Sequence, residues 1–271
     1  MVDIKQSPLL KSITKLSFQL EKWKEDNSPI RIPDFIHAFF ARNEFMDLQK
    51  YTPGNSELFF YSLLRSCDQE FQKAFHLSSN FTLSSLFRAD LLQYQICTDF
   101  HHEEEYTFSQ HLFILNPNTK TIQESINLLY ASSEAECQIH NSPVIIFPTF
   151  IDCPSVLVFK INIETSCPKF FSNEGKYQNF NCPIITMKLG KEKDKEVLYE
   201  LQSISISAAH HSNAIVRKIQ SRHCNWYFVD DERSCSFNFS AFNYSKGTFF
   251  QKNMNSVILF FSKVKELENL N

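Results

Sequence analysis

The stretch LYELQSISISAAHHSNAIVRKIQSRHCNWYFVDDE, residues 198–232, decides the fold. It contains strand-like runs at residues 198–206, 209–217 and 226–232. Histidine lies near the start of the second run and an acid near the end of the third, so we expect an imidazole to meet a carboxylate. Such a pair is half of a nucleophilic triad, because the acid orients the histidine that takes a proton from Cys or Ser.

The composition is that of a globular protein. Its 271 residues suit one large domain or two small ones, and an apolar content of 43% is enough for a substantial core. The chain has 28 phenylalanines but only 4 glycines. Glycine lets the backbone approach a ligand closely, and no Gly-rich motif occurs, so a phosphate-binding loop is excluded.

Charge and hydropathy argue against two classes of partner. The net charge is −3 and the pI is near 6.3, without a basic stripe for nucleic acid. The segment from Lys188 to Lys195 also holds Glu192 and Asp194, and we expect a solvated loop there. Neither a long apolar run nor a signal-like N-terminus occurs, so we expect an intracellular protein of the cytoplasm or nucleus that contacts no membrane. Its cysteines should then be reduced, at Cys67, Cys97, Cys137, Cys153, Cys167, Cys182, Cys224 and Cys235.

The first third of the chain is predicted to be helical. A helix from about Pro8 to Glu25 follows from apolar residues at steps of three and four: Leu9, Ile13, Leu16, Leu20 and Trp23. A second helix is expected to start at Pro33 and a third at Asn55 or Ser56. Cys67 lies inside the third helix, where we expect it in the core.

From Phe81 onward the pattern changes to short segments rich in Phe, Ile, Tyr and Val. We expect strands at residues 91–97, 106–115, 156–163 and 184–189, and a central strand covered on both faces at 256–261. A short helix should follow Thr121, which can form a capping box with Glu124. Helices first and strands after indicate an α+β architecture.

The order of these segments resembles the catalytic domain of the ubiquitin-specific proteases, a family of papain-like cysteine hydrolases with a helical thumb, β-rich fingers and a palm. Two matches are Gly54-Asn55-Ser56-Glu57-Leu58-Phe59, similar to the family's Asp-Ala-x-Glu-Phe-Leu helix, and Cys153-Pro154-Ser155-Val156-Leu157, similar to its Leu-Pro-x-Val-Leu strand. Others are residues 85–97, 183–185, 199–201, 214–217, 226–231 and 257–261. The resemblance implies one domain at 8–262, with a thumb remnant at 8–80, fingers and palm strands at 81–165, palm at 166–262, and a tail at 263–271.

The resemblance gives the histidine and the acid their roles. His211 falls on the family's catalytic base and Asp230 on the acid that orients it. His210 and Ser212 stand where the family has Gly and an aromatic residue, and residues 207–210 replace a glycine-containing loop beside the ubiquitin tail. The family's Gly-Asn-Thr-Cys box, in which the nucleophile begins a helix, occurs nowhere in the sequence. The predicted site therefore lacks its nucleophile.

Structural roles remain open for the same residues. The pairs His210-His211 and Asp230-Asp231 also suit polar turns between strands. Trp226 and Tyr227 suit the core or a half-buried sheet.

Many family members hold zinc in the fingers through two Cys-x-x-Cys knuckles. Here the first would be Cys97-Thr-Asp-Phe, without its second ligand, and the second runs from Cys137 to His140. The candidates for a two-Cys, two-His site are Cys97, His101 or His102, Cys137 and His140. We expect instead no metal or other cofactor, with fingers packed by Tyr94, Phe108 and Phe113.

Taken together, the residues and the resemblance predict a catalytically inactive protein that binds ubiquitin or a ubiquitin-like protein, or serves as a scaffold for other proteins. The alternative is an active cysteine-type deubiquitinase whose Cys box is missing from this chain. A third reading is that only the fold remains, in a structural part of a complex that does not contact ubiquitin.

Overall fold

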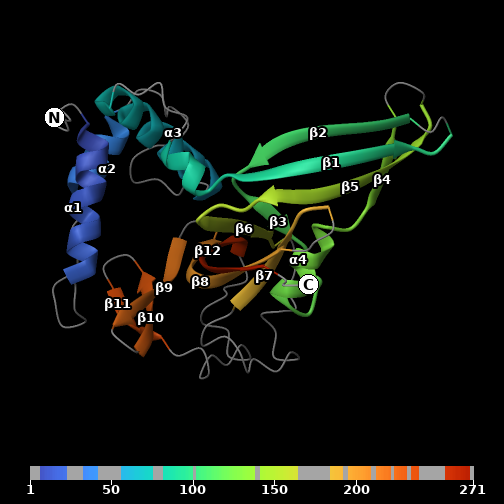
Figure 1. Ribbon diagram of the computed structural model, residues 1–271. Coiled ribbons are helices and arrows are strands. Elements are labelled where there is room, and N and C mark those ends of the chain that lie inside the picture. Colours follow the sequence, from blue (N-terminus) through green and yellow to red (C-terminus); the bar gives the residue numbers. More distant parts are fainter. Residues whose placement is uncertain are drawn as a thin grey trace. The chain divides into compact units, whose positions relative to one another are not determined.

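The structure is a computed structural model, shown in Figure 1. It describes residues 7–22, 33–41, 56–75, 82–99, 102–137, 141–163, 184–191, 195–208, 212–220, 223–230, 233–237 and 254–268. The architecture of these residues is mixed, with few helices and many strands. The chain divides into two compact units, one of Met1–Leu86 with Ser205–Phe237, the other of Phe87–Ile204 with Asn238–Asn271.

Three helices open the first unit: α1 (Pro8–Lys22), α2 (Pro33–Phe40) and α3 (Ser56–Phe75). Proline begins α1 and α2 because its fixed φ suits a first turn, where its missing N–H costs nothing. Leu9, Phe39 and Cys67, one from each helix, are fully buried in one cluster. The predicted core position of Cys67 is confirmed, whereas Trp23 lies outside the described residues. None of the described helices is long and apolar enough to cross a membrane.

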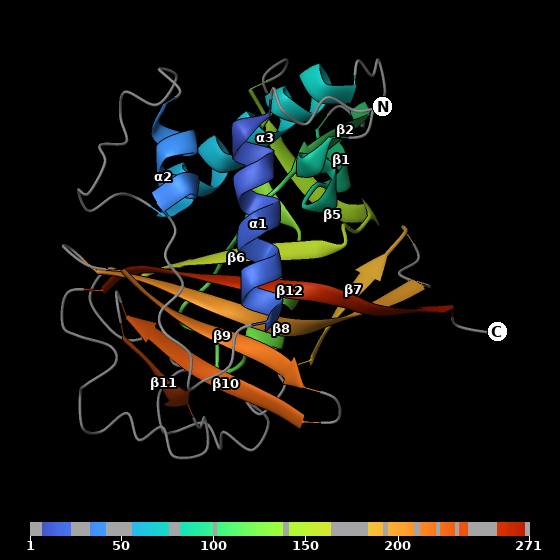
Figure 2. The same cartoon turned by 90° about the vertical axis from the view of Figure 1, so that its left-hand side faces the viewer.

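The strands of the first unit form an antiparallel meander. They are β9 (Ser212–Gln220), β10 (His223–Asp230) and β11 (Arg233–Phe237), which lie side by side in Figure 2 and follow the end of β8 (Lys195–Ala208). Trp226 and Tyr227 are 5% and 4% exposed, so both belong to the core, as predicted. Because neighbours along a strand point to opposite faces, β10 is covered on both.

After a short 3-10 helix (Leu83–Leu86) that ends the helical part of the first unit, the second unit begins with four antiparallel strands, which we call the finger sheet. These are β1 (Ala89–Cys97), β2 (His102–Gln110), β4 (Ser133–Glu136) and β5 (Pro143–Asp152). β1 pairs with β2 on one side and β5 on the other, and β4 pairs with the far side of β5 (Figure 1). The strand predicted at 91–97 is confirmed as β1.

The segment 106–115, predicted as one strand, divides into two. β2 ends at Gln110, and β3 (Phe113–Leu115) pairs in parallel with β6 (Val156–Asn162). At the break, the Gln110 side-chain amide donates to the carbonyl oxygen of Leu112 at 2.6 Å. Phe113, expected in the fingers, therefore packs on Phe159, with ring centroids 6.1 Å apart. The prediction was wrong because alternation of apolar residues does not reveal a change of partner strand.

The core of the second unit lies around β6 and its antiparallel partner β12 (Met254–Glu268). Ile258 and Leu259, neighbours on β12, are both fully buried. The central strand predicted at 256–261 is confirmed, and it continues to Glu268. β7 (Ile184–Leu189), also predicted, pairs with β8 along its length and with β5 at a single residue pair.

Helix α4 (Ile122–Leu128) has the predicted N-cap with one difference. The Thr121 hydroxyl accepts a hydrogen bond from the Glu124 N–H at 3.0 Å. The Glu124 carboxylate, however, accepts from the N–H of Lys120 at 2.8 Å rather than from that of Thr121. The acid therefore closes the turn one residue earlier than a capping box would.

The solvated loop expected from Lys188 to Lys195 is shorter than predicted. Lys188 belongs to β7 and Lys195 to β8. Lys188 lies opposite Glu196 in register, with Nζ 3.9 Å from Oε1. The loop prediction overlapped the strand predicted at 184–189, and that strand does continue through Lys188, with its other face burying Met187.

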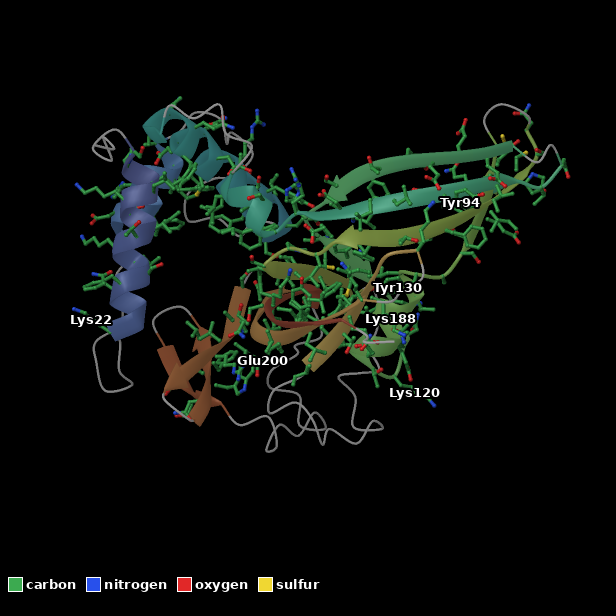
Figure 3. All side chains as sticks on the ribbon, viewed as in Figure 1. Lys22, Tyr94, Lys120, Tyr130, Lys188 and Glu200 are labelled. Carbon is green, nitrogen blue, oxygen red and sulfur yellow. The ribbon has the colours of Figure 1, made fainter. Side chains whose placement is uncertain are left out.

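Side chains of α4 and the residues after it bind the backbone of β7. Gln123 accepts from the Thr186 N–H at 2.8 Å and donates to the Thr186 carbonyl at 3.0 Å. The Tyr130 hydroxyl accepts from the N–H of Lys188 at 2.8 Å, and Figure 3 shows these two residues side by side. These contacts satisfy polar backbone groups of β7.

We expect the substitution Tyr130→Phe to reduce the loss of stability at alkaline pH. Burial raises the pKa of Tyr130 well above its usual value. The unfolded chain releases this proton near pH ~10, whereas the folded chain keeps it, so stability falls as pH rises above ~10. Urea unfolding at neutral and alkaline pH should show a smaller fall for Tyr130→Phe than for the parent. Tyr106→Phe, at an exposed position of β2, is the control, and equal falls in Tyr130→Phe and the parent would contradict the prediction.

Candidate functional site

The strands that flank the predicted histidine and acid are adjacent. β9 begins at Ser212, directly after His211, and β10 ends at Asp230. The register places Val229 opposite Ala214, so the end of β10 lies beside the beginning of β9. His211 and the side chain of Asp230 lie outside what the structure describes. The backbone arrangement is compatible with a dyad, and the dyad itself stays a prediction.

The beginning of α3 contacts the strand that leads to His211. The hydroxyl oxygens of Ser56 and Ser207 are 2.8 Å apart, and Ser207 is buried near the end of β8. This contact joins the start of α3, the helix matched to the family's Asp-Ala-x-Glu-Phe-Leu segment, to Ser207. Ser207 is the first residue of the segment that the resemblance sets beside the ubiquitin tail. Sequence reasoning missed this contact because two serines separated by 151 positions leave no pattern.

Tyr61 follows Glu57 by one turn of α3, on the same side of the helix. Partial burial and then the charge of Glu57 raise the pKa of the Tyr61 phenol. Tyr61 therefore keeps its proton at neutral pH and is a hydrogen-bond donor rather than a base.

The cysteines whose side chains the structure describes are not placed as nucleophiles. Cys67, Cys97, Cys137 and Cys153 are all buried, at 0–8% exposure. A reactive thiolate needs partial exposure and a positive environment such as a helix N-terminus. Cys67 lies in the middle of α3, and the other three lie in or just after strands. None of these four thiols can substitute for the family's nucleophile.

The two predicted zinc thiols are close together at the tip of the finger sheet. Cys97 and Cys137 share a small buried cluster with Val144. The Cys97 sulfur is 2.9 Å from the Ser142 hydroxyl, and the Cys137 N–H donates to the Ser142 carbonyl at 2.8 Å. The predicted imidazole ligands lie outside what is described: His101, the His102 side chain and His140.

The fit of these residues to zinc is incomplete. No group of three His, Cys, Asp or Glu that could hold a metal occurs in the described part of the chain. Two thiols are half of the donors of a tetrahedral zinc site. The described residues therefore do not by themselves form a zinc site.

Comparison with known proteins identifies the fold. Neither a family model nor a curated protein sequence matches this chain. Solved structures of the SAGA deubiquitinating module do match. The Ubp8/Sgf11/Sus1/Sgf73 module bound to monoubiquitin matches with a TM-score of 0.63 at 16% identity, over 86% of this chain and 53% of that chain. The Ubp8-Sgf11-Sgf73-Sus1 module matches with 0.65 at 14% identity, over 96% and 58%. A yeast module with altered Sgf73 matches with 0.56 at 14% identity, over 78% and 51%.

The chain thus has a fold like that of Ubp8, a deubiquitinase of the ubiquitin-specific protease class. At 14–16% identity the likeness concerns the fold alone. The chain spans about half the length of the chains it matches, at 51–58%. The resemblance inferred from the order of the segments is therefore supported for the fold, and for the fold alone.

Proposed function

We propose that this chain is a catalytically inactive protein with a ubiquitin-specific-protease fold, which binds ubiquitin or a ubiquitin-like protein and acts as a scaffold in the cytoplasm or nucleus. The observation that carries the proposal is a fold like that of a module bound to monoubiquitin, in a chain in which the four cysteines with described side chains are all buried. A His211–Asp230 pair without a thiol would have a base and no nucleophile. Loss of one triad member removes most of the rate advantage.

A ubiquitin C-terminal electrophile separates binding from catalysis. Incubation of the chain with ubiquitin propargylamide should give no covalent adduct by intact mass spectrometry, while an active ubiquitin-specific protease reacts under the same conditions. Titration of the chain into ¹⁵N-labelled ubiquitin should shift a contiguous set of ubiquitin resonances. An adduct at any cysteine would overturn the inactive assignment, and unchanged ubiquitin spectra would overturn the binding assignment.

The second candidate function is an active cysteine-type deubiquitinase. It is favoured by His211 and Asp230 standing at sequence positions that match the family's base and acid, and by a register that sets Ala214, near the start of β9, opposite Val229, near the end of β10. It requires a Gly-Asn-Thr-Cys-like segment in the same reading frame upstream of Met1, or a thiol from another chain. The genomic sequence upstream tests the first, and the electrophile assay with cell extract added tests the second.

A further inference from the structure

The two faces of the finger sheet differ, and only one of them carries the buried fingertip cluster. Residues paired in register share a face, so Cys97, Val144 and Ile146 lie on one face, where the buried fingertip cluster forms. The opposite face carries apolar and acidic side chains. We call it the acidic–aromatic face and define it by Tyr94, Phe147, Glu103, Glu105, Glu134 and Glu136.

The acidic side chains of this face lie on its two margins, with apolar side chains between them. One row across the strands is Glu105, Tyr94 and Phe147, and the next is Glu103, Ile96, Ile145 and Glu134. The glutamates are exposed and Phe147 is 38% exposed. The face is therefore an accessible apolar strip between two negative rims.

The negative charge of the chain is concentrated in this region. Residues 89–152 contain nine Asp or Glu and a single Lys or Arg, although the net charge of the whole chain is only −3. Such a local excess attracts a partner of opposite charge and accelerates its association. The partner that fits is basic.

One lysine of the chain already shows how the face holds an ammonium group. The Lys191 amine forms an ion pair with the Glu105 carboxylate and lies 5.8 Å from the centroid of the Tyr94 ring. A hydrogen bond with the Glu103 carboxylate raises the pKa of the Tyr94 phenol, which therefore stays a donor. Figure 3 labels Tyr94 on the finger sheet. The Glu105 carboxylate and the Tyr94 ring together form a binding site for a lysine ammonium group at the β2 margin of the face.

We propose that the acidic–aromatic face binds a basic amphipathic helix of a partner protein. Four strands set the rims about 14 Å apart, which accommodates an α-helix of about 10–12 Å diameter with its lysines reaching both rims. The apolar side of the helix packs on Tyr94 and Phe147, and its flanking lysines pair with Glu103 and Glu134. This inference does not depend on ubiquitin binding.

Fluorescence anisotropy with a designed peptide tests the proposal. The probe is a fluorescein-labelled helix of about 18 residues with leucine along one side and lysine on both flanks, and the control peptide has glutamate in place of every lysine. The lysine peptide should bind saturably, more weakly as salt is raised, and the glutamate peptide should not bind. The double variant Glu103→Gln/Glu134→Gln should weaken binding about three- to tenfold.

A matched variant controls for charge alone. Glu104 is exposed on β2 between Glu103 and Glu105 but points to the opposite face, so Glu104→Gln should change affinity less than Glu103→Gln. Lys191→Ala should strengthen binding, since it frees the Glu105 carboxylate, whereas Lys188→Ala should strengthen it less. Equal effects of Glu103→Gln and Glu104→Gln would overturn the proposal. Binding of the glutamate peptide would also overturn it. So would the absence of any anisotropy change with the lysine peptide when the same chain shifts the resonances of labelled ubiquitin.

Discussion

Replacing Phe159 with alanine is expected to lower the free energy of unfolding of the second unit by about 3–5 kcal/mol. Phe159 is fully buried in β6, and its ring centroid is 6.1 Å from that of Phe113 and 5.8 Å from that of Phe261. β6 is paired with β12 on one side and β3 on the other. Strands held on both sides cannot move inward to close the cavity, so the loss lies at the upper end for such substitutions.

Urea unfolding followed by circular dichroism measures this loss, and hydrogen exchange of β6 and β12 amides assigns it to the second unit. The matched control is Ile114→Ala on β3, because Ile114 adjoins Phe113 but is 58% exposed. The control should cost less than about 1 kcal/mol. Comparable losses for the two variants would show that the Phe159 ring is not the centre of this core.

Helices and the central strand could be predicted from sequence because their signals are local. Proline at Pro8 and Pro33 marks two helix starts, and the apolar run within β12 marks a strand covered on both faces. The division between β2 and β3 and the start of β8 at Lys195, three residues before the predicted run, were not predicted. In both cases the outcome depends on which strand the segment pairs with, and residue alternation carries no record of that partner.

For the candidate site too, local patterns could be read from the sequence, whereas contacts between distant segments could not. The order of segments indicated a fold like that of the ubiquitin-specific proteases, which the structural comparisons support. The histidine–acid pair stays a prediction, since the register at that end of β9 and β10 describes only Ala214 and Val229. The Ser56–Ser207 contact and the gathering of glutamates on one face of the finger sheet are products of pairing between distant segments. Glu103, Glu104 and Glu105 form one acidic run in the sequence, and the alternation of side chains along β2 places Glu104 on the opposite face from the other two.

The substitution Glu70→Ala is expected to lower the free energy of unfolding of the first unit by about 2–3 kcal/mol. Glu70 is 1% exposed on α3, and its carboxylate accepts from the N–H groups of Leu9 at 3.2 Å and Leu10 at 2.9 Å. It thus satisfies free N–H groups in the first turn of α1 and places negative charge at the positive end of the helix. Removing it leaves the buried N–H of Leu9 and the part-buried N–H of Leu10 without this acceptor.

Ser7 provides the decisive control, because it precedes Pro8 at the usual position of an N-cap. Its buried hydroxyl has no hydrogen-bond partner among the described residues. Ser7→Ala should therefore cost less than the ~1 kcal/mol typical of a lost serine cap. The loss of unfolding free energy in Glu70→Gln, which keeps one acceptor oxygen but loses the charge, should lie between the losses in Ser7→Ala and Glu70→Ala.

Hydrogen exchange locates the effect in the chain. Faster exchange at the amides of Leu9 and Leu10 in Glu70→Ala would place it at the start of α1. A Ser7→Ala loss as large as that of Glu70→Ala would assign the cap to the local serine and contradict a tertiary cap from α3.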